Sequence, residues 1–210
     1  MWSVRSVLVT MLVGGATSAM AAPPRELMSV VSIRVHDYAQ TDRRHLQQAE
    51  REVSRIYEGI GVRLDWRQSL RPAELEASQA AWPTDVAMVT LVVLAPAMSD
   101  RLDAPGDVVG YAPLSRERGG RVAFVFGGRA RDIATSGDVS QGKVLAGVMA
   151  HELAHLLNPR GTHSTEGVMR AHWTAAEFKR LNRQRFSDAE GSSIRQTVRA
   201  LGGGPMRVAD

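Results

Sequence analysis

Cysteine is absent from this 210-residue sequence. Without thiols the chain forms no disulfide, offers no thiolate ligand to a metal and has no cysteine nucleophile. Charge of one sign is also scarce: the formal net charge of +4 is spread along the chain and forms no dense Lys/Arg block. A bias this small gives no reason to expect nucleic acid as a partner.

Apolar runs long enough to cross a bilayer are lacking as well. At the N-terminus, Arg5 precedes the short apolar run Val7–Val13, and Ala19-Met20-Ala21 follows. A basic residue, a short apolar stretch and small residues at the first and third places of a triplet are typical of a signal peptide. An uncleaved membrane anchor is the alternative, and the short run disfavours it. We therefore predict that residues 1–21 are a signal peptide. Residues 22–210 then form a secreted domain, periplasmic or extracellular, without a membrane association.

The rest of the chain has the length and composition of one globular domain. Apolar residues at spacings of three and four predict a helix over 41–57, and alternation predicts a half-buried strand over 62–66. The order of elements predicts an α/β (α+β) domain with a mixed, mostly parallel sheet and a helical C-terminal lobe. The expected strands are 30–35, 62–66, 86–94 (central, covered on both faces), 108–114 (an edge) and 121–126; the expected helices are 41–57, 140–157, one from 174 and 192–201, with 71–83 an irregular connection.

The segment His151-Glu152-Leu153-Ala154-His155 carries the chemistry. Residues four apart lie on one face of a helix, so the two imidazoles can chelate one Zn²⁺. Glu152 is placed to take a proton from a water on that metal. The apolar residues around this segment predict a buried helix, in which paired histidines need a partner such as a metal ion.

A third ligand must follow the helix, because a catalytic zinc usually has three protein ligands and one open place. Asn158-Pro159 predicts the end of the helix, and Asn158 tolerates a left-handed conformation there. A turn would then bring His163 back to the metal. The rival ligand is Glu177, but Thr174 and Glu177 also form a capping-box pattern; Glu166 is a further, loop-borne candidate. We predict His163.

The stretch HELAHLLNPRGTH, followed by Gly167-Val168-Met169, resembles the metzincin clan of zinc metallopeptidases. The resemblance implies one Zn²⁺ held by His151, His155 and His163, Glu152 as general base and a Met-turn at Met169. It also implies a zincin-like fold and a peptide or protein substrate. Seven residues separate the second and third histidines, where the clan has five, and Asn158 stands in the place of a glycine.

Three further residues are candidates for the cleft around such a site. His172 can donate to a developing oxyanion or serve as a surface residue, Trp173 is a packing anchor, and Tyr111 can line an edge strand where peptides pair. The sequence leaves two other functions open: a zinc hydrolase of non-peptide amides or esters, and a non-catalytic exported zinc-binding protein. The oligomeric state cannot be predicted from the sequence.

Overall fold

The computed structural model describes residues 28–68, 87–102, 104–113, 121–158 and 161–202. The strands are β1 (Ser29–Asp37), β2 (Val62–Gln68), β3 (Ala87–Leu94), β4 (Gly110–Tyr111) and β5 (Val122–Phe126). The helices are α1 (Arg43–Glu58), α3 (Pro96–Ser99), α4 (Gly127–Ser136), α5 (Gln141–Leu157), α6 (Ala175–Lys179) and α7 (Asp188–Ala200), with 3-10 turns η1 (Asp100–Leu102) and η2 (Leu181–Arg183). The predicted signal peptide and the predicted connection 71–83 lie outside the described residues.

The five strands form one sheet in the order β2-β1-β3-β5-β4. The pairs β1–β2, β1–β3 and β3–β5 are parallel, and β4 is antiparallel to β5. Helix α1 makes the crossover between the parallel neighbours β1 and β2, as parallel strands require. Of the expected strand 108–114, whose residues 108–113 are described, Gly110–Tyr111 form β4, which lies at an edge. The prediction of a mixed, mostly parallel sheet is confirmed.

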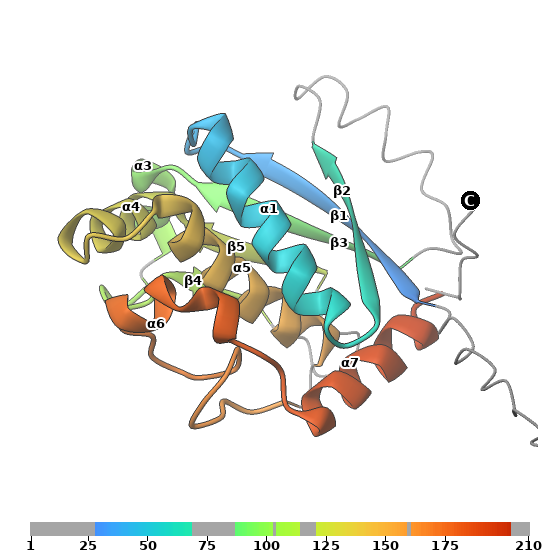
Figure 1. Ribbon diagram of the computed structural model, residues 1–210. Coiled ribbons are helices and arrows are strands. Elements are labelled where there is room, and N and C mark those ends of the chain that lie inside the picture. Colours follow the sequence, from blue (N-terminus) through green and yellow to red (C-terminus); the bar gives the residue numbers. More distant parts are fainter. Residues whose placement is uncertain (1–27, 69–86, 103, 114–120, 159–160, 203–210) are drawn as a thin grey trace, which may run out of the picture.

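Alternate residues of the central strands build the core on one face of the sheet, which α1 and α5 cover (Figure 1). On β3, Leu91 and Val93 are fully buried, whereas Met88, Thr90 and Val92 on the opposite face are only half-buried. The prediction that this strand is covered on both faces therefore holds fully for one face and only in part for the other. An uninterrupted apolar run cannot show on which side the helices pack.

Helices α1 and α5 differ in how much of their surface the core takes. Five residues of α1 are buried, on the single face that the sequence predicted. In α5, thirteen of seventeen residues are buried, because apolar side chains occupy every side of this helix. The predicted burial of α5 is confirmed, so packing against several neighbours fixes its position.

Three helices differ from the sequence expectation, and the short α3 has no predicted counterpart. Helix α4 was not predicted, because Gly127-Gly128 at its start is typical of a turn. A Cβ at Gly127 would lie 2.6 Å from the Cβ of Ala39, so glycine permits close packing there. Helix α7 begins at Asp188, four residues before the predicted start, after a Ser187–Glu190 capping box. Among the described helices, none has the length and apolar character that a membrane span needs.

Candidate metal centre

His151 and His155 lie one turn apart on α5, and Glu152 lies between them in sequence. The two histidines are half-buried, while Glu152 is only 7% exposed. The neighbouring Leu153 is fully buried in the core. Because the buried faces of α5 are held by packing, the direction in which the two histidines project is fixed as well.

The turn after α5 starts at Asn158, where the helix was predicted to end. The Asn158 N–H donates to the Ala154 carbonyl at 2.7 Å, but its φ is −138°. The expected left-handed conformation is therefore wrong. Asn158 is instead buried, and its Oδ1 accepts a 2.7 Å hydrogen bond from Ser193 Oγ on α7. A side-chain contact with a distant helix thus holds this turn.

A closed loop brings His163 back toward α5. The N–H of Ser164 donates to the Met169 carbonyl at 2.9 Å, and the N–H of Val168 donates to the Arg185 carbonyl at 3.1 Å. Gly167 has a φ of +73°, a conformation that favours glycine. Met169 itself is 1% exposed. The loop is therefore fixed by backbone hydrogen bonds on both sides of its tip.

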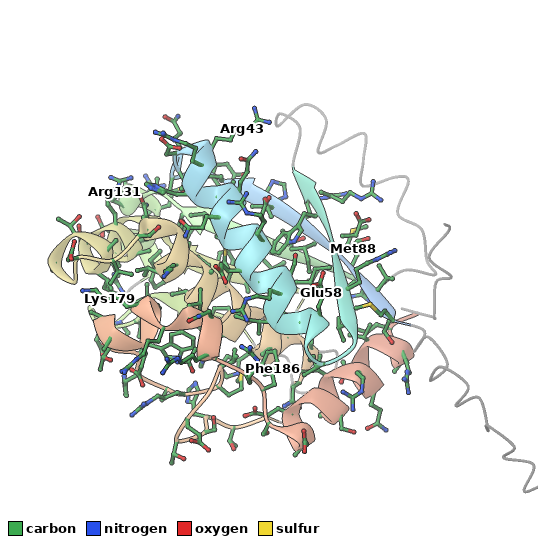
Figure 2. The ribbon with its side chains drawn as sticks, viewed as in Figure 1. Arg43, Glu58, Met88, Arg131, Lys179 and Phe186 are labelled. Atoms are coloured by element: carbon green, nitrogen blue, oxygen red, sulfur yellow. The ribbon has the colours of Figure 1, made fainter. Side chains whose placement is uncertain are left out.

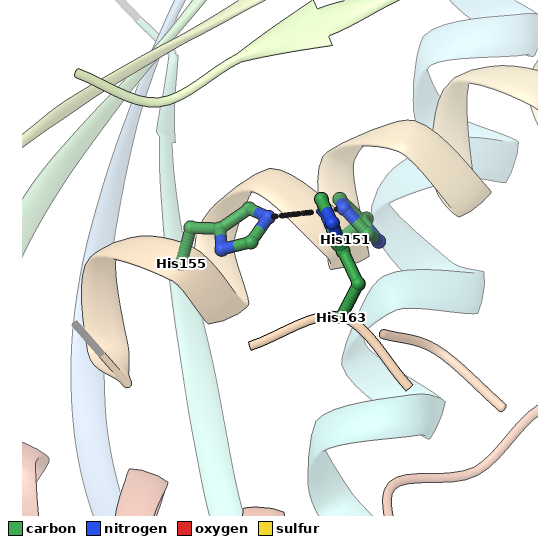
Figure 3. A group of neighbouring side chains, drawn as sticks. All are labelled: His151, His155 and His163. Atoms are coloured by element: carbon green, nitrogen blue, oxygen red, sulfur yellow. Dashed lines mark hydrogen bonds between the residues drawn. The ribbon is translucent and has the colours of Figure 1, made fainter. Parts of the chain in front are cut away.

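The three imidazoles converge through their Nε2 atoms (Figure 3). His155 Nε2 lies 3.1 Å from His151 Nε2 and 3.2 Å from His163 Nε2. A tetrahedral zinc with Zn–N bonds of 2.0–2.1 Å separates its ligand nitrogens by about 3.3–3.4 Å. Each imidazole nitrogen has a single in-plane direction for a proton or a lone pair. One cation between the three nitrogens satisfies them all, so the group fits a metal ion.

The protonation states suit metal binding. The carbonyl of Val168 only accepts, so His151 Nδ1 must donate across the 2.9 Å that separates them, which leaves a lone pair on Nε2. Burial lowers the pKa of His151. Burial, together with the charges of His151 and His163, lowers the pKa of His155 to about 4. Neutral imidazole is the form that binds metals.

Glu152 is covered by the edge strand β4. A Cβ at Gly110 would lie 2.6 Å from both Cγ and Oε1 of Glu152, so only glycine lets β4 pass this closely. Burial raises the pKa of the Glu152 carboxyl to about 8. A cation nearby would lower this pKa again, because an opposite charge favours the ionised form.

A cleft of about 560 Å³ contains the three histidines and Glu152. Strand β4 forms one wall, with Tyr111 51% exposed, and residues 170–173 form another. His172 is exposed at this wall. Trp173 packs over Gly147 of α5, and its buried Nε1 has no hydrogen-bond partner among the described residues. The cleft thus contains Tyr111, His172 and Trp173, the three residues that the sequence singled out around the site.

The carboxylate of Glu177, the rival ligand, is engaged by Thr174 and Arg170. Its Oε2 accepts hydrogen bonds from the Thr174 N–H at 2.6 Å and the Thr174 hydroxyl at 2.9 Å, and Oε1 pairs with Arg170. The predicted capping box is therefore confirmed. Glu166 is exposed in the loop. Among the described residues, His151, His155 and His163 are the group of three or more ligand-type side chains close enough to share a metal ion.

No protein-family model matches the chain, and no curated protein matches its sequence. Among solved structures, the fold is similar to the crystal structure of archaemetzincin from Methanopyrus kandleri. The two share 17% identity with a TM-score of 0.47, and the match covers 84% of this chain and 98% of that one. A likeness this distant assigns no residue a role, so the geometry of the site must carry the function.

Proposed function

We propose that the chain is a zinc-dependent hydrolase of peptide bonds, with the zinc held by Nε2 of His151, His155 and His163. The convergence of these three nitrogens beside the buried carboxyl of Glu152 carries the proposal. Three protein ligands leave a fourth place for water, as in catalytic zinc sites. A structural site would usually add a fourth protein ligand and needs no general base.

Glu152 is the general base of the proposed reaction. When bound, zinc polarises the scissile carbonyl and acidifies a water molecule. Glu152 accepts the proton of that water at its carboxylate and returns it to the leaving nitrogen. Burial under β4 limits the contact of this carboxylate with bulk solvent, which strengthens its interaction with the reacting groups.

A peptide substrate suits the walls of the cleft. Among the described strands, β4 is the last of the sheet, and such an edge presents main-chain groups for pairing with an extended peptide. The loop around Met169, whose Val168 carbonyl orients His151, takes the place of a metzincin Met-turn in this proposal. The basic and apolar pattern of residues 5–21 supports export of the protein.

Zinc content and peptide hydrolysis, measured on the wild type and Glu152→Gln, test the proposal. We expect about one zinc per chain in both proteins, because the substitution spares the ligands. Hydrolysis of a mixed peptide library should fall by about 10²–10⁴-fold in Glu152→Gln. Glu166→Gln, an exposed carboxylate on the neighbouring loop, is the matched control and should keep both properties.

Two results would contradict the proposal in different ways. Zinc content near zero that added zinc does not restore would remove the metal site and the enzyme with it. Unchanged hydrolysis in Glu152→Gln would leave the metal site in place but exclude Glu152 as the base. For export, N-terminal sequencing of protein recovered outside the cytoplasm should begin at Ala22.

A further inference from the structure

A second hollow, of about 650 Å³, adjoins the metal cleft in the C-terminal lobe. Loop 164–167, the end of α6, the turn η2 and the start of α7 surround it. The segment that carries most of its basic residues runs between Lys179 and Phe186, both labelled in Figure 2. Four guanidinium groups line this arginine hollow: Arg170, Arg180, Arg183 and Arg185.

Three carboxylates also line the hollow, Glu166, Glu177 and Glu190, against the four arginines. Glu177 and Glu190 each close a capping box, and Glu190 Oε2 accepts from the Ser187 N–H at 2.7 Å. Of the four arginines, Arg170 pairs with Glu177. The other three form no ion pair within the described part of the chain. Their positive charges are therefore available to a ligand.

Backbone contacts orient two of the free guanidinium groups. Arg185 donates to the carbonyls of Asn182 and Gln184, both at 2.7 Å, and Arg180 Nε donates to the Ala176 carbonyl at 3.3 Å. Carbonyl oxygens orient a guanidinium group without cancelling its charge. Residues 161–202 contain seven Lys/Arg and four Asp/Glu, which gives +3 of the formal net charge of +4. The expectation that the net charge is spread evenly along the chain is therefore wrong for this segment. The lining of the hollow itself carries four arginines against three carboxylates, a formal charge of +1.

We propose that the arginine hollow binds an acidic segment of the peptide substrate while the neighbouring segment lies in the metal cleft; this rests on the proposed function. Arg170 lines both cavities, and Ser164, which lines the hollow, directly follows His163. A peptide that leaves the cleft past His163 therefore reaches the arginines. Guanidinium groups bind carboxylates through paired hydrogen bonds, which gives acidic side chains an advantage over neutral ones.

Binding of two labelled peptides tests the proposal without turnover. One fluorescein-labelled peptide carries four consecutive Glu residues and the other carries Gln at the same places, and anisotropy is measured with Glu152→Gln protein. The Glu peptide should bind about tenfold more tightly at low salt, and the difference should shrink at about 0.5 M NaCl, because salt screens exposed charges. In Arg180→Glu/Arg183→Glu the preference should disappear.

The matched control is Arg43→Glu/Arg131→Glu, which reverses two exposed charges on α1 and α4. Both residues lie away from the hollow (Figure 2). Circular dichroism and zinc content check that each variant is folded. A preference that is lost with Arg180 and Arg183 but kept in the control supports the proposal. Equal binding of the two peptides, or a preference that survives Arg180→Glu/Arg183→Glu, overturns it.

The outcome for the hollow can be separated from the outcome for the proposed function. With the active wild type, the Glu peptide should have a lower KM than the Gln peptide at similar kcat, since the arginines contact the substrate away from the reacting bond. If the wild type hydrolyses neither peptide but the preference still depends on Arg180 and Arg183, the proposed function fails and the acidic-peptide site stands.

Discussion

The two parts of the candidate metal centre are built in different ways. His151, Glu152 and His155 belong to α5, a helix with thirteen of its seventeen residues buried. His163 is exposed and stands on a loop. Core packing orients the helix part, whereas hydrogen bonds to α7 and to the backbone at Arg185 orient the loop part.

The helix ligands are placed by local sequence spacing, whereas the loop ligand is placed by long-range contacts. The spacing within α5 alone brings two imidazoles and a carboxylate to one place. For His163 to reach them, Asn158 must meet Ser193, and Val168 must meet Arg185. Substitutions in the C-terminal lobe should therefore act on the loop ligand and spare the helix ligands.

Removing one histidine from each part should give the largest effects. His151→Ala and His163→Ala should each lower zinc affinity by more than about 100-fold, because each removes a direct ligand. Loss of a residue that only hydrogen-bonds to a ligand already lowers metal affinity by about 10–100-fold. In the metal-free protein the two should differ. His151→Ala leaves the Val168 carbonyl without its donor and should lower the free energy of unfolding by about 1–3 kcal/mol. His163→Ala should change it by less than about 0.5 kcal/mol.

A chelator competition assay gives the zinc affinities, and urea unfolding in EDTA gives the free energies. His172→Ala is the matched control, since His172 lines the same cleft outside the group of three. It should keep full zinc affinity. If His163→Ala destabilised the metal-free protein as much as His151→Ala, the distinction between the two parts would be lost.

The pH dependence of the metal-free protein should report on the helix part. Glu152 has a pKa of about 8 in the folded chain against an ordinary value of 4.5. A raised carboxyl pKa contributes stability below pH 4.5 that is lost as pH rises toward 8. The lowered pKa values of His151 and His155 act below pH 6.5, where stability falls with falling pH. Between pH 6.5 and 8, therefore, the free energy of unfolding should fall by about 2 kcal/mol.

Urea unfolding in EDTA at these two pH values measures that change, with Glu152→Gln as the comparison. The variant lacks the titrating carboxyl, so its free energy of unfolding should stay level between pH 6.5 and 8. A parallel decline in the variant would assign the loss to other groups. Saturating zinc should remove the decline in the wild type, because the cation favours ionised Glu152.

An added methyl group at the contact between α5 and the wall of the cleft should destabilise the fold. A Cβ at Gly147 would lie 2.7 Å from Phe178 Cε1 and 2.9 Å from Trp173 Cζ3. Overpacking costs about 1–3 kcal/mol, and the better helix propensity of alanine recovers up to about 1 kcal/mol. Gly147→Ala should therefore lower the free energy of unfolding by about 1 kcal/mol. Gly106→Ala, where an added Cβ meets nothing within 4 Å, should leave it unchanged.

Features that depend on neighbouring residues in the sequence could be predicted, and features that depend on distant contacts could not. The periodicity of α1 and the burial of α5 could be predicted because each depends on residues close in sequence. The mostly parallel sheet could be predicted from the order of strands and helices along the chain. Helix α4 could not, since its double glycine is explained only by packing against Ala39. In the site, the spacing of the histidines predicted their group. No local signal shows that Gly110 must lack a side chain above Glu152, or that Asn158 is held by Ser193.

The Ser193–Asn158 hydrogen bond should give the smallest effect and the sharpest test of long-range control. Ser193→Ala removes the donor to the buried Asn158 Oδ1 and should cost about 1 kcal/mol of unfolding free energy. Zinc affinity should fall by less than about tenfold, since His163 is displaced but not lost. Ser192→Ala, an exposed neighbour on α7, is the control.

In the His163→Ala background, Ser193→Ala should have no further effect on zinc affinity, because the hydrogen bond acts on the metal only through the loop. An equal loss of affinity with and without His163 would show that α7 acts on the helix ligands instead.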